Sequence, residues 1–264
     1  MKRFFPVGVI TMLSLAKQSA AFFSSKTTRV SSGLKLSKMK EIAPTYFPKS
    51  INQKRYVQYL DDKDNKIIAG VGPAGTGKTL FACLQGIKDL QRGDVNKIIL
   101  TRPVVPVEED LGFLPGSLNK KMDPWVRPIF DLFLEYFTQK DIDAMLNANV
   151  LEISPLAYMR GRTFKRSFII ADEMQNSSPN QMMMVTTRIG VGSRMVLTGD
   201  LKQCDKGNTN GLGDFIHRLH PYKEWYYSGE THKEPLGIRV VEFEKEDVER
   251  SPIVKHVLGI YGSD

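Results

Sequence analysis

The chain has 264 residues, of which 41% are apolar and 25% are charged, and its formal net charge is +8. These values are typical of a globular protein with a core of its own. Residues 1–40 contain eight Lys and Arg and no acidic residue, which leaves 29 basic and 29 acidic residues in the rest of the chain. The net charge therefore gives no support to a nucleic-acid partner for the folded part.

Residues 1–40 have the composition of a targeting segment. Lys2 and Arg3 precede an apolar stretch at 4–16, which is too short to span a bilayer, and small residues follow. From Phe22 the chain is rich in Ser and Thr, basic and free of acids. We predict a disordered leader with a signal peptide at 1–21 and a transit segment at 22–40, followed by one domain at 41–264 without a membrane segment.

This leader resembles the bipartite plastid leaders of algae with secondary plastids, which predicts a plastid (chloroplast) location. The alternatives are mitochondrion, secretion, or a cytoplasmic protein with a disordered N-terminus that carries no address. Two cysteines without metal spacing, Cys83 and Cys204, exclude a disulfide framework, and four scattered histidines predict no metal site.

Apolar runs and helical patterns alternate along the rest of the chain. Strands are predicted at 65–71, 96–101, 149–154, 166–172 and 193–200, and a late strand in the tail that begins at Gly237. Helices are predicted at 78–90, after Pro124, near 142–148, at 179–189 and at the C-terminus. Because each strand is a continuous apolar run, we expect an α/β fold whose mainly parallel central sheet is flanked by helices in three layers.

The stretch GPAGTGKT follows the first strand and opens the first helix. It matches the P-loop pattern G-x-x-x-x-G-K-[ST] in the strand–loop–helix context that this motif requires. Its glycines allow backbone N–H groups to point at phosphate oxygens, Lys78 supplies a positive charge, and Thr79 supplies a hydroxyl for Mg²⁺. The residues predicted to bind the nucleotide are Gly72, Pro73, Ala74, Gly75, Thr76, Gly77, Lys78 and Thr79.

The stretch FIIADEMQN places two acids at the end of a buried strand. With a P-loop present, Asp172 is predicted to hold Mg²⁺ together with Thr79, and Glu173 to activate the attacking water. A two-metal nuclease site would need more acids nearby, and a kinase would not need a base for water. Solvated acids remain the simplest alternative. Gln175 is a further candidate, as a relay beside Glu173.

Two amide side chains complete the predicted site. Gln203 follows the next strand in TGDLKQ with Asp200, and this pair is predicted to sense the γ-phosphate, a simple turn being the alternative. Gln53 lies upstream of the P-loop, where an amide could select adenine and hence ATP, although a lone Gln is usually a surface residue.

Five segments in order resemble the PhoH-like ATPases, relatives of superfamily-one helicases: GPAGTGKT, TRPVVPVEEDLGFLPGSLNKKMDPWVRPIFD, EISPLAYMRGRTF, FIIADEMQN and TGDLKQCD. The resemblance covers about residues 50–260. It implies a P-loop NTPase core of the RecA/helicase type, adenine recognition by Gln53, a sensor role for Gln203, and an RNA-linked role. It also implies a homo-oligomeric ring, with six as the expected number of subunits.

The remaining predictions about residues concern arginines. Arg102, Arg160 and Arg162 are candidate contacts for RNA or single-stranded nucleic acid, the alternative being ordinary solvated arginines. Arg250, with Arg239 as its rival, is predicted to act as an arginine finger donated by a neighbouring subunit. The leading hypothesis is a Mg²⁺-dependent ATPase coupled to RNA or single-stranded nucleic acid. The alternatives are a ring-forming ATPase switch that acts on protein partners and a small-molecule kinase.

Overall fold

The computed structural model describes residues 43–103, 118–203, 210–228 and 234–249, and the single residues 253 and 260, with no side-chain description for 118–126. The predicted leader, Cys204, Arg250 and the predicted last helix therefore lie outside the described residues. Within them, six strands form one sheet: β1 (Ile67–Val71), β2 (Lys97–Thr101), β3 (Leu151–Ile153), β4 (Ser167–Ala171), β5 (Arg194–Gly199) and β6 (Ile238–Glu242). Their order is β3-β2-β4-β5-β1-β6, and every pair is parallel.

The described helices are α2 (Ile51–Asp61), α3 (Lys78–Arg92), α4 (Leu118–Tyr136), α5 (Gln139–Asn147), α6 (Pro179–Thr186) and α7 (Gly211–Ser228). Short 3₁₀ turns are η1 (Leu156–Met159), η2 (Met174–Asn176) and η3 (Lys245–Asp247). The start predicted for α4 after Pro124 was wrong, because the helix begins at Leu118. Helices α2 and α7 were not predicted at all.

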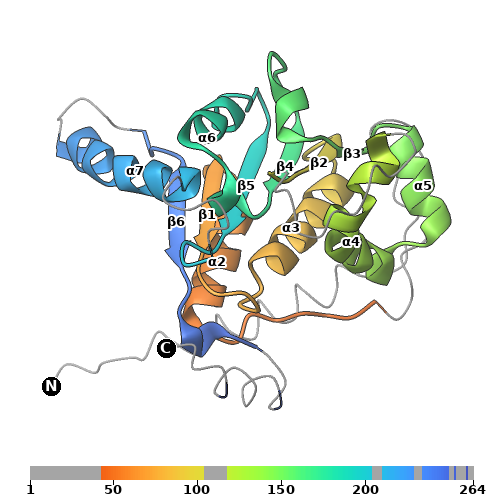
Figure 1. Ribbon diagram of the computed structural model, residues 1–264, viewed down its shortest axis with the longest axis horizontal. Helices are drawn as coiled ribbons and strands as arrows, with labels where there is room; N and C mark the ends of the chain where they lie inside the picture. The colour runs from red at the N-terminus through yellow and green to blue at the C-terminus, as the bar shows by residue number, and fades with distance from the viewer. Residues whose placement is uncertain are drawn as a thin grey trace, which may run out of the picture.

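The sheet separates two apolar cores. On one face Ile68, Ile98 and Phe168 pack against α2, α3, α4 and α5. On the other face Ile99 and Ile169 pack against η1, α6 and α7. Figure 1 shows α6 and α7 on one side of the sheet and α3, α4 and α5 on the other. Successive strand residues point to opposite faces, and both faces are covered, which explains the continuous apolar runs and confirms the predicted three-layer α/β fold.

The parallel arrangement brings several loops to one edge of the sheet. The carboxyl ends of β1, β2, β4 and β5 are followed by the P-loop, Arg102, Asp172 and Asp200 respectively. The segment after β6 also returns to this edge, where the Phe243 N–H donates to the Val71 carbonyl over 2.7 Å. Among the described helices, none is both long and apolar enough to cross a membrane.

Candidate active site

The P-loop adopts a conformation that requires glycine at two points. Gly72 has φ 140°, and a Cβ built there would lie 2.3 Å from the carbonyl oxygen of Phe243. Gly77 has φ 84° and precedes α3, and a Cβ there would lie 2.9 Å from the ring of Phe81. The loop is therefore packed closely on both sides, and it ends at the N-terminus of a helix of 15 residues, where N–H groups favour an anion.

Lys78 lies inside the loop with 8% of its surface exposed. Its ammonium donates to the carbonyl oxygens of Gly72 and Pro73, over 2.6 Å each, and to Thr76 Oγ1 over 3.3 Å. Burial lowers the pKa of Lys78, while the carboxylates of Asp200, Glu173 and Asp172 act in the opposite direction. The lysine is thus a buried cation whose hydrogen bonds go to neutral carbonyl and hydroxyl groups.

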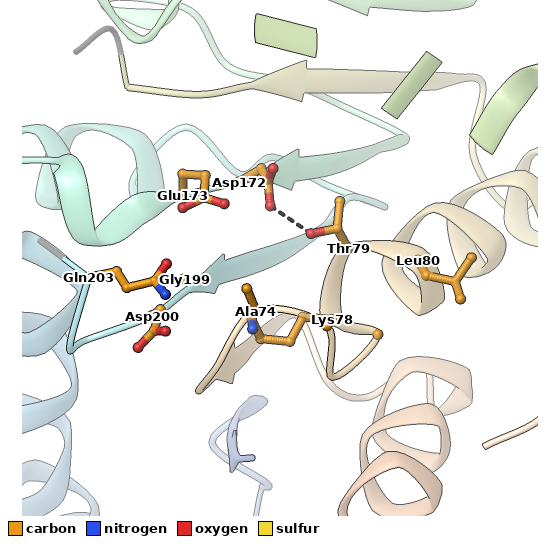
Figure 2. Close-up of a pocket in the computed structure, with 11 residues that line it drawn as sticks. Ala74, Lys78, Thr79, Leu80, Asp172, Glu173, Gly199, Asp200 and Gln203 are labelled. Atoms are coloured by element: carbon orange, nitrogen blue, oxygen red, sulfur yellow. Dashed lines mark hydrogen bonds between the residues drawn. The ribbon is translucent and has the colours of Figure 1, made fainter. Parts of the chain in front are cut away.

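The Asp172 carboxylate accepts hydrogen bonds from hydroxyl groups of two other elements. Thr79 Oγ1 donates to its Oδ1 over 2.8 Å, and Thr198 Oγ1 on β5 donates to the same oxygen. The residue is 6% exposed, and its N–H donates to the Thr101 carbonyl of β2 over 2.9 Å. The carboxylate is therefore held in a defined position facing the start of α3 (Figure 2).

The oxygen groups near Asp172 fit Mg²⁺ bound together with phosphate. A carboxylate and a threonine hydroxyl are hard ligands, and Mg²⁺ in proteins usually takes one or two carboxylates with phosphate oxygens and water. In the part of the chain that the structure describes, no group of three or more His, Cys, Asp or Glu could hold a metal by itself. Asp172 and Thr79 are the residues that would hold such an ion, together with phosphate oxygens and water.

Glu173 occupies a strained backbone position next to Asp172. Its φ is 54°, in the left-handed region, which costs roughly 1–3 kcal/mol for a residue other than glycine. Gln175 Nε2 donates to its Oε2 over 2.6 Å, and an Arg102 guanidinium nitrogen lies 3.6 Å from its Oε1. The carboxylate is therefore contacted from two directions.

Gln175 connects the ends of β4 and β5. It is 1% exposed, and its Oε1 accepts from the N–H of Asp200 over 3.2 Å. A Cβ on Gly199 would lie 2.6 Å from that oxygen, so the close approach requires glycine there. The amide thus places Glu173 and the start of the segment that carries Gln203 in one hydrogen-bonded unit.

These elements enclose a cavity of about 240 Å³. Figure 2 shows Asp172 and Glu173 on one side of this space and the P-loop residues on the other. The residues that line it are Ala74, Gly75, Gly77, Lys78, Thr79, Leu80, Asp172, Glu173, Gly199, Asp200 and Gln203. The structure therefore brings together the predicted phosphate, magnesium, water and sensor residues, from loops that follow β1, β4 and β5.

Gln53 lies behind the P-loop and is not among the described residues that line the cavity. It is 1% exposed; its Oε1 accepts from the N–H groups of Lys49 and Ser50, over 2.7 and 3.2 Å. Its Nε2 donates to the carbonyls of Thr76 and Asp247, over 3.3 and 3.4 Å. The amide joins α2 to the P-loop and η3, and its contact with adenine stays a prediction.

The predicted arginines lie in different places. Arg160 is exposed after β3, and Arg162 pairs with Glu152 over 2.5 Å, with its guanidinium 4.5 Å from the centre of the Phe164 ring. Arg239 donates to Asn65 Oδ1 over 3.1 Å, near the start of β6, and so lies at the opposite edge from the cavity. Arg250 follows Glu249, whose N–H donates to the Gly75 carbonyl over 3.0 Å, but lies outside the described residues.

Two contacts of this site were not predicted from the sequence. The bond from Thr198 to Asp172 had a weak signal, a hydroxyl residue two positions before Asp200 in a strand that ends at the same edge. The pairing of Arg102 with Glu173 had no signal, because it depends on β2 lying beside β4 in the sheet.

Comparison with known proteins identifies the family. A family model described as PhoH-like protein matches residues 46–262. PhoH-like proteins of Bacillus subtilis (strain 168) and Mycobacterium tuberculosis (strain H37Rv) are 40% and 41% identical over 215 and 219 residues, 81% and 82% of this chain. Protein PhoH of Escherichia coli (strain K12) is 35% identical over 213 residues, 79% of this chain.

The chain spans less than two thirds of these relatives, covering 63%, 58% and 56% of their lengths respectively. Among solved structures, the UvsW helicase from bacteriophage T4 matches 88% of this chain and 78% of its own, with 11% identity and a TM-score of 0.45, a similarity too weak to assign a function. The family model and the curated relatives both extend over the P-loop, the Asp172–Glu173 pair and the TGDLKQ segment. The chain belongs to the PhoH-like protein family, and it is a P-loop protein of that family.

Proposed function

We propose that this chain is a Mg²⁺-dependent ATPase that hydrolyses ATP to ADP and phosphate. The observation that carries the proposal is the convergence of Lys78, Asp172 and Glu173 on one cavity at the ends of β1 and β4. A cation, a candidate metal ligand and a carboxylate base are the groups that nucleotide hydrolysis requires, and they come from separate elements that only the fold brings together.

The P-loop binds the phosphates in this proposal. The Lys78 ammonium exchanges its bonds to the Gly72 and Pro73 carbonyls for charge-assisted bonds to phosphate oxygens, which are stronger. Thr79 Oγ1 and the Asp172 carboxylate hold Mg²⁺, which when bound neutralises charge on the phosphates. Gln53, behind the loop, is proposed to read the adenine, which makes ATP the substrate.

Glu173 activates the water. Its carboxylate accepts a proton as the water oxygen forms a bond to the γ-phosphorus, while the bond from that phosphorus to the oxygen bridging the β-phosphate breaks and ADP leaves. Gln203 lies on the same cavity and contacts the γ-phosphate before hydrolysis and the free phosphate after it. Gln175 keeps Glu173 and the segment containing Gln203 in a fixed relation.

We further propose that ATP turnover is coupled to RNA or single-stranded nucleic acid through Arg102, Arg160 and Arg162. Arg102 directly follows β2 at the edge that carries the cavity, and Arg160 and Arg162 follow the neighbouring strand β3 after the 3₁₀ turn η1. Arginine binds the phosphodiester backbone irrespective of sequence. A homo-oligomeric ring of six subunits, with Arg250 donated in trans as catalytic arginine finger, and delivery to a plastid by residues 1–40 complete the proposal.

ATP turnover measured with and without Mg²⁺ and single-stranded RNA tests this function. The Glu173→Gln variant is expected to keep nucleotide affinity and lose turnover by about 10²–10⁴-fold, because it removes the base and keeps the shape. Lys78→Ala is expected to lose nucleotide binding. Transfer of labelled phosphate to a metabolite, with turnover intact in Glu173→Gln, would instead identify a kinase. Absence of RNA binding at low ionic strength and of RNA stimulation would favour the ATPase switch that acts on proteins.

A further inference from the structure

The carboxylate of Glu173 is held by two residues of different accessibility. Gln175, 1% exposed, donates to Oε2 over 2.6 Å from within the same turn. Arg102, whose side chain is 30% exposed, lies 3.6 Å from Oε1 and comes from the end of β2. One oxygen is therefore fixed by a buried amide, and the other faces a cation that solvent can reach.

Arg102 approaches Glu173 from outside the nucleotide cavity. Strand β2 lies beside β4 on the side opposite to β5 and β1, so Arg102 and the P-loop lie on different sides of Glu173. Arg102 is not among the described residues that line the cavity. A ligand can therefore contact Arg102 without entering the space that the nucleotide occupies.

Two further arginines follow strand β3, beyond the 3₁₀ turn η1. Arg160 is exposed after β3, and the side chain of Arg162 is 41% exposed despite its pairing with Glu152. A solvent-accessible guanidinium outside the cavity suits a phosphodiester backbone, which arginine binds irrespective of sequence.

The contact between Arg102 and Glu173 is weak enough to be exchanged. Its partners are 30% and 36% exposed at 3.6 Å, whereas the pair between Arg194 and Asp89 is 6% and 2% exposed at 3.1 Å. Exposed ion pairs contribute little to stability, and another anion can replace the carboxylate at little cost. While the pair persists, Oε1 faces the guanidinium instead of a water in the cavity.

We propose that Arg102 is a positioning residue that restrains Glu173, and that a phosphodiester backbone bound at Arg102 releases it for catalysis. Gln175 retains Oε2 when Arg102 leaves, so that the base stays in the cavity. The inference rests on the proposed ATPase function and supplies its link to nucleic acid. The expected stimulation is about two- to fivefold, the factor that corresponds to roughly 0.4–1 kcal/mol.

The test compares full-length wild type with Arg102→Gln at saturating ATP and Mg²⁺, with and without poly(U) RNA. The variant is expected to turn over ATP about two- to fivefold faster than wild type without RNA, with unchanged ATP affinity and no further stimulation by RNA. Arg218→Gln is the matched control, because it removes the same charge and an Arg–carboxylate pair to Asp214 within α7, at 2.8 Å. It is expected to retain the wild-type basal rate and RNA stimulation.

Several results would overturn the restraint. A basal rate of Arg102→Gln equal to or below that of wild type does so even if RNA stimulation is lost, because Arg102 would then only bind RNA. Stimulation of wild type by polyglutamate as strong as that by poly(U) overturns the phosphodiester as ligand. A thermal melt of Arg102→Gln excludes misfolding of that variant. Arg102→Lys, which keeps the positive charge, is expected to retain stimulation by RNA. If wild type hydrolyses ATP and Glu173→Gln does not, the proposed ATPase function stands whatever the result for Arg102→Gln. If wild type does not hydrolyse ATP, the proposed ATPase function itself is refuted.

Discussion

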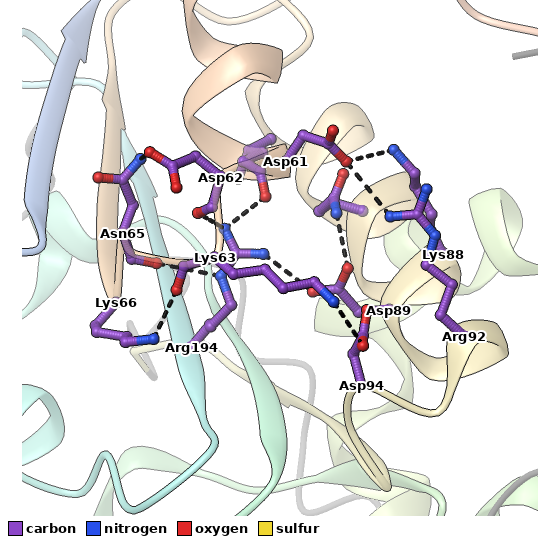
Figure 3. Close-up of polar contacts among 12 residues, drawn as sticks. Asp61, Asp62, Lys63, Asn65, Lys66, Lys88, Asp89, Arg92, Asp94 and Arg194 are labelled. Carbon is purple, nitrogen blue, oxygen red and sulfur yellow. Dashed lines mark hydrogen bonds and ion pairs between the residues drawn. The ribbon is translucent and has the colours of Figure 1, made fainter. Parts of the chain in front are cut away.

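The two edges of the sheet both bury charged side chains, but they neutralise them in different ways. At the amino edge, Arg194 donates to Asp89 over 3.1 Å and to the carbonyls of Asn65, Leu60 and Asp62 (Figure 3). Burial raises the pKa of Asp89, and the guanidinium of Arg194 opposes this. The arginine thus pairs a carboxylate and also satisfies the carbonyls at the end of α2.

At the carboxyl edge, the described residues that line the cavity contribute three carboxylates, Asp172, Glu173 and Asp200, and one ammonium, Lys78. The hydrogen bonds of that ammonium to Gly72, Pro73 and Thr76 go to carbonyl and hydroxyl oxygens, none of which carries a charge. The amino edge thus pairs its buried carboxylate with a protein cation, whereas the described lining of the cavity carries more carboxylates than ammonium groups, which suits the metal cation of the proposed function.

Replacement of Arg194 by Met should give the largest change in stability. We expect the free energy of unfolding to fall by about 3–5 kcal/mol, since Asp89 and the α2 carbonyls lose their buried partner. Urea denaturation at pH 7 measures this. The double variant with Asp89→Leu should recover part of the loss, and a loss below about 1 kcal/mol would show that the amino edge does not depend on this pair.

Two buried glutamines sharpen the comparison, because each donates to a carboxylate at one edge. Gln175→Leu is expected to lower kcat by roughly 10- to 100-fold with nucleotide affinity unchanged, the effect of losing a bond worth about 1.5–3 kcal/mol to a charged group. Gln85→Leu loses a 2.7 Å hydrogen bond to Asp89. We expect its free energy of unfolding to fall by about 1.5–3 kcal/mol and its turnover per folded molecule to stay unchanged. Equal kcat losses in both variants would contradict the distinction.

Replacement of Lys78 by Met should have the smallest effect on stability. We expect the free energy of unfolding, measured without nucleotide and Mg²⁺, to stay constant or rise by up to about 1 kcal/mol, since a buried ammonium without a tight carboxylate partner is replaced by an apolar side chain. Nucleotide binding should be lost in the same variant. Destabilisation approaching that of Arg194→Met would mean that Lys78 is a structural cation.

The sequence predicted the parts of this molecule that burial and local chemistry determine. All six strands lie in predicted segments, because both faces of the sheet are covered and strands β1, β4 and β5 are buried at every residue. The P-loop and the Asp172–Glu173 pair were found because their chemistry requires fixed residue types at fixed spacing. The helix predicted at 179–189 is α6, which begins at Pro179 with Ser178 as its N-cap and ends at Thr186.

Other parts depend on tertiary context. Helix α2 is mostly polar, and its signal was the capping box of Ser50 and Gln53, with Tyr56 and Leu60 as buried contacts. Helix α7 contains Pro221, which argues against a helix in any local reading. The contact between Arg102 and Glu173 follows from strand order, which no local pattern encodes.

The packing of the last described segment on the P-loop has a consequence for biosynthesis. Phe243 covers Gly72, and the Glu249 N–H donates to the Gly75 carbonyl, so residues translated long after the P-loop support it. A growing chain therefore carries its complete P-loop sequence long before that loop has its outer wall. The P-loop therefore acquires this support only after the segment with Phe243 and Glu249 has been translated and has packed against it.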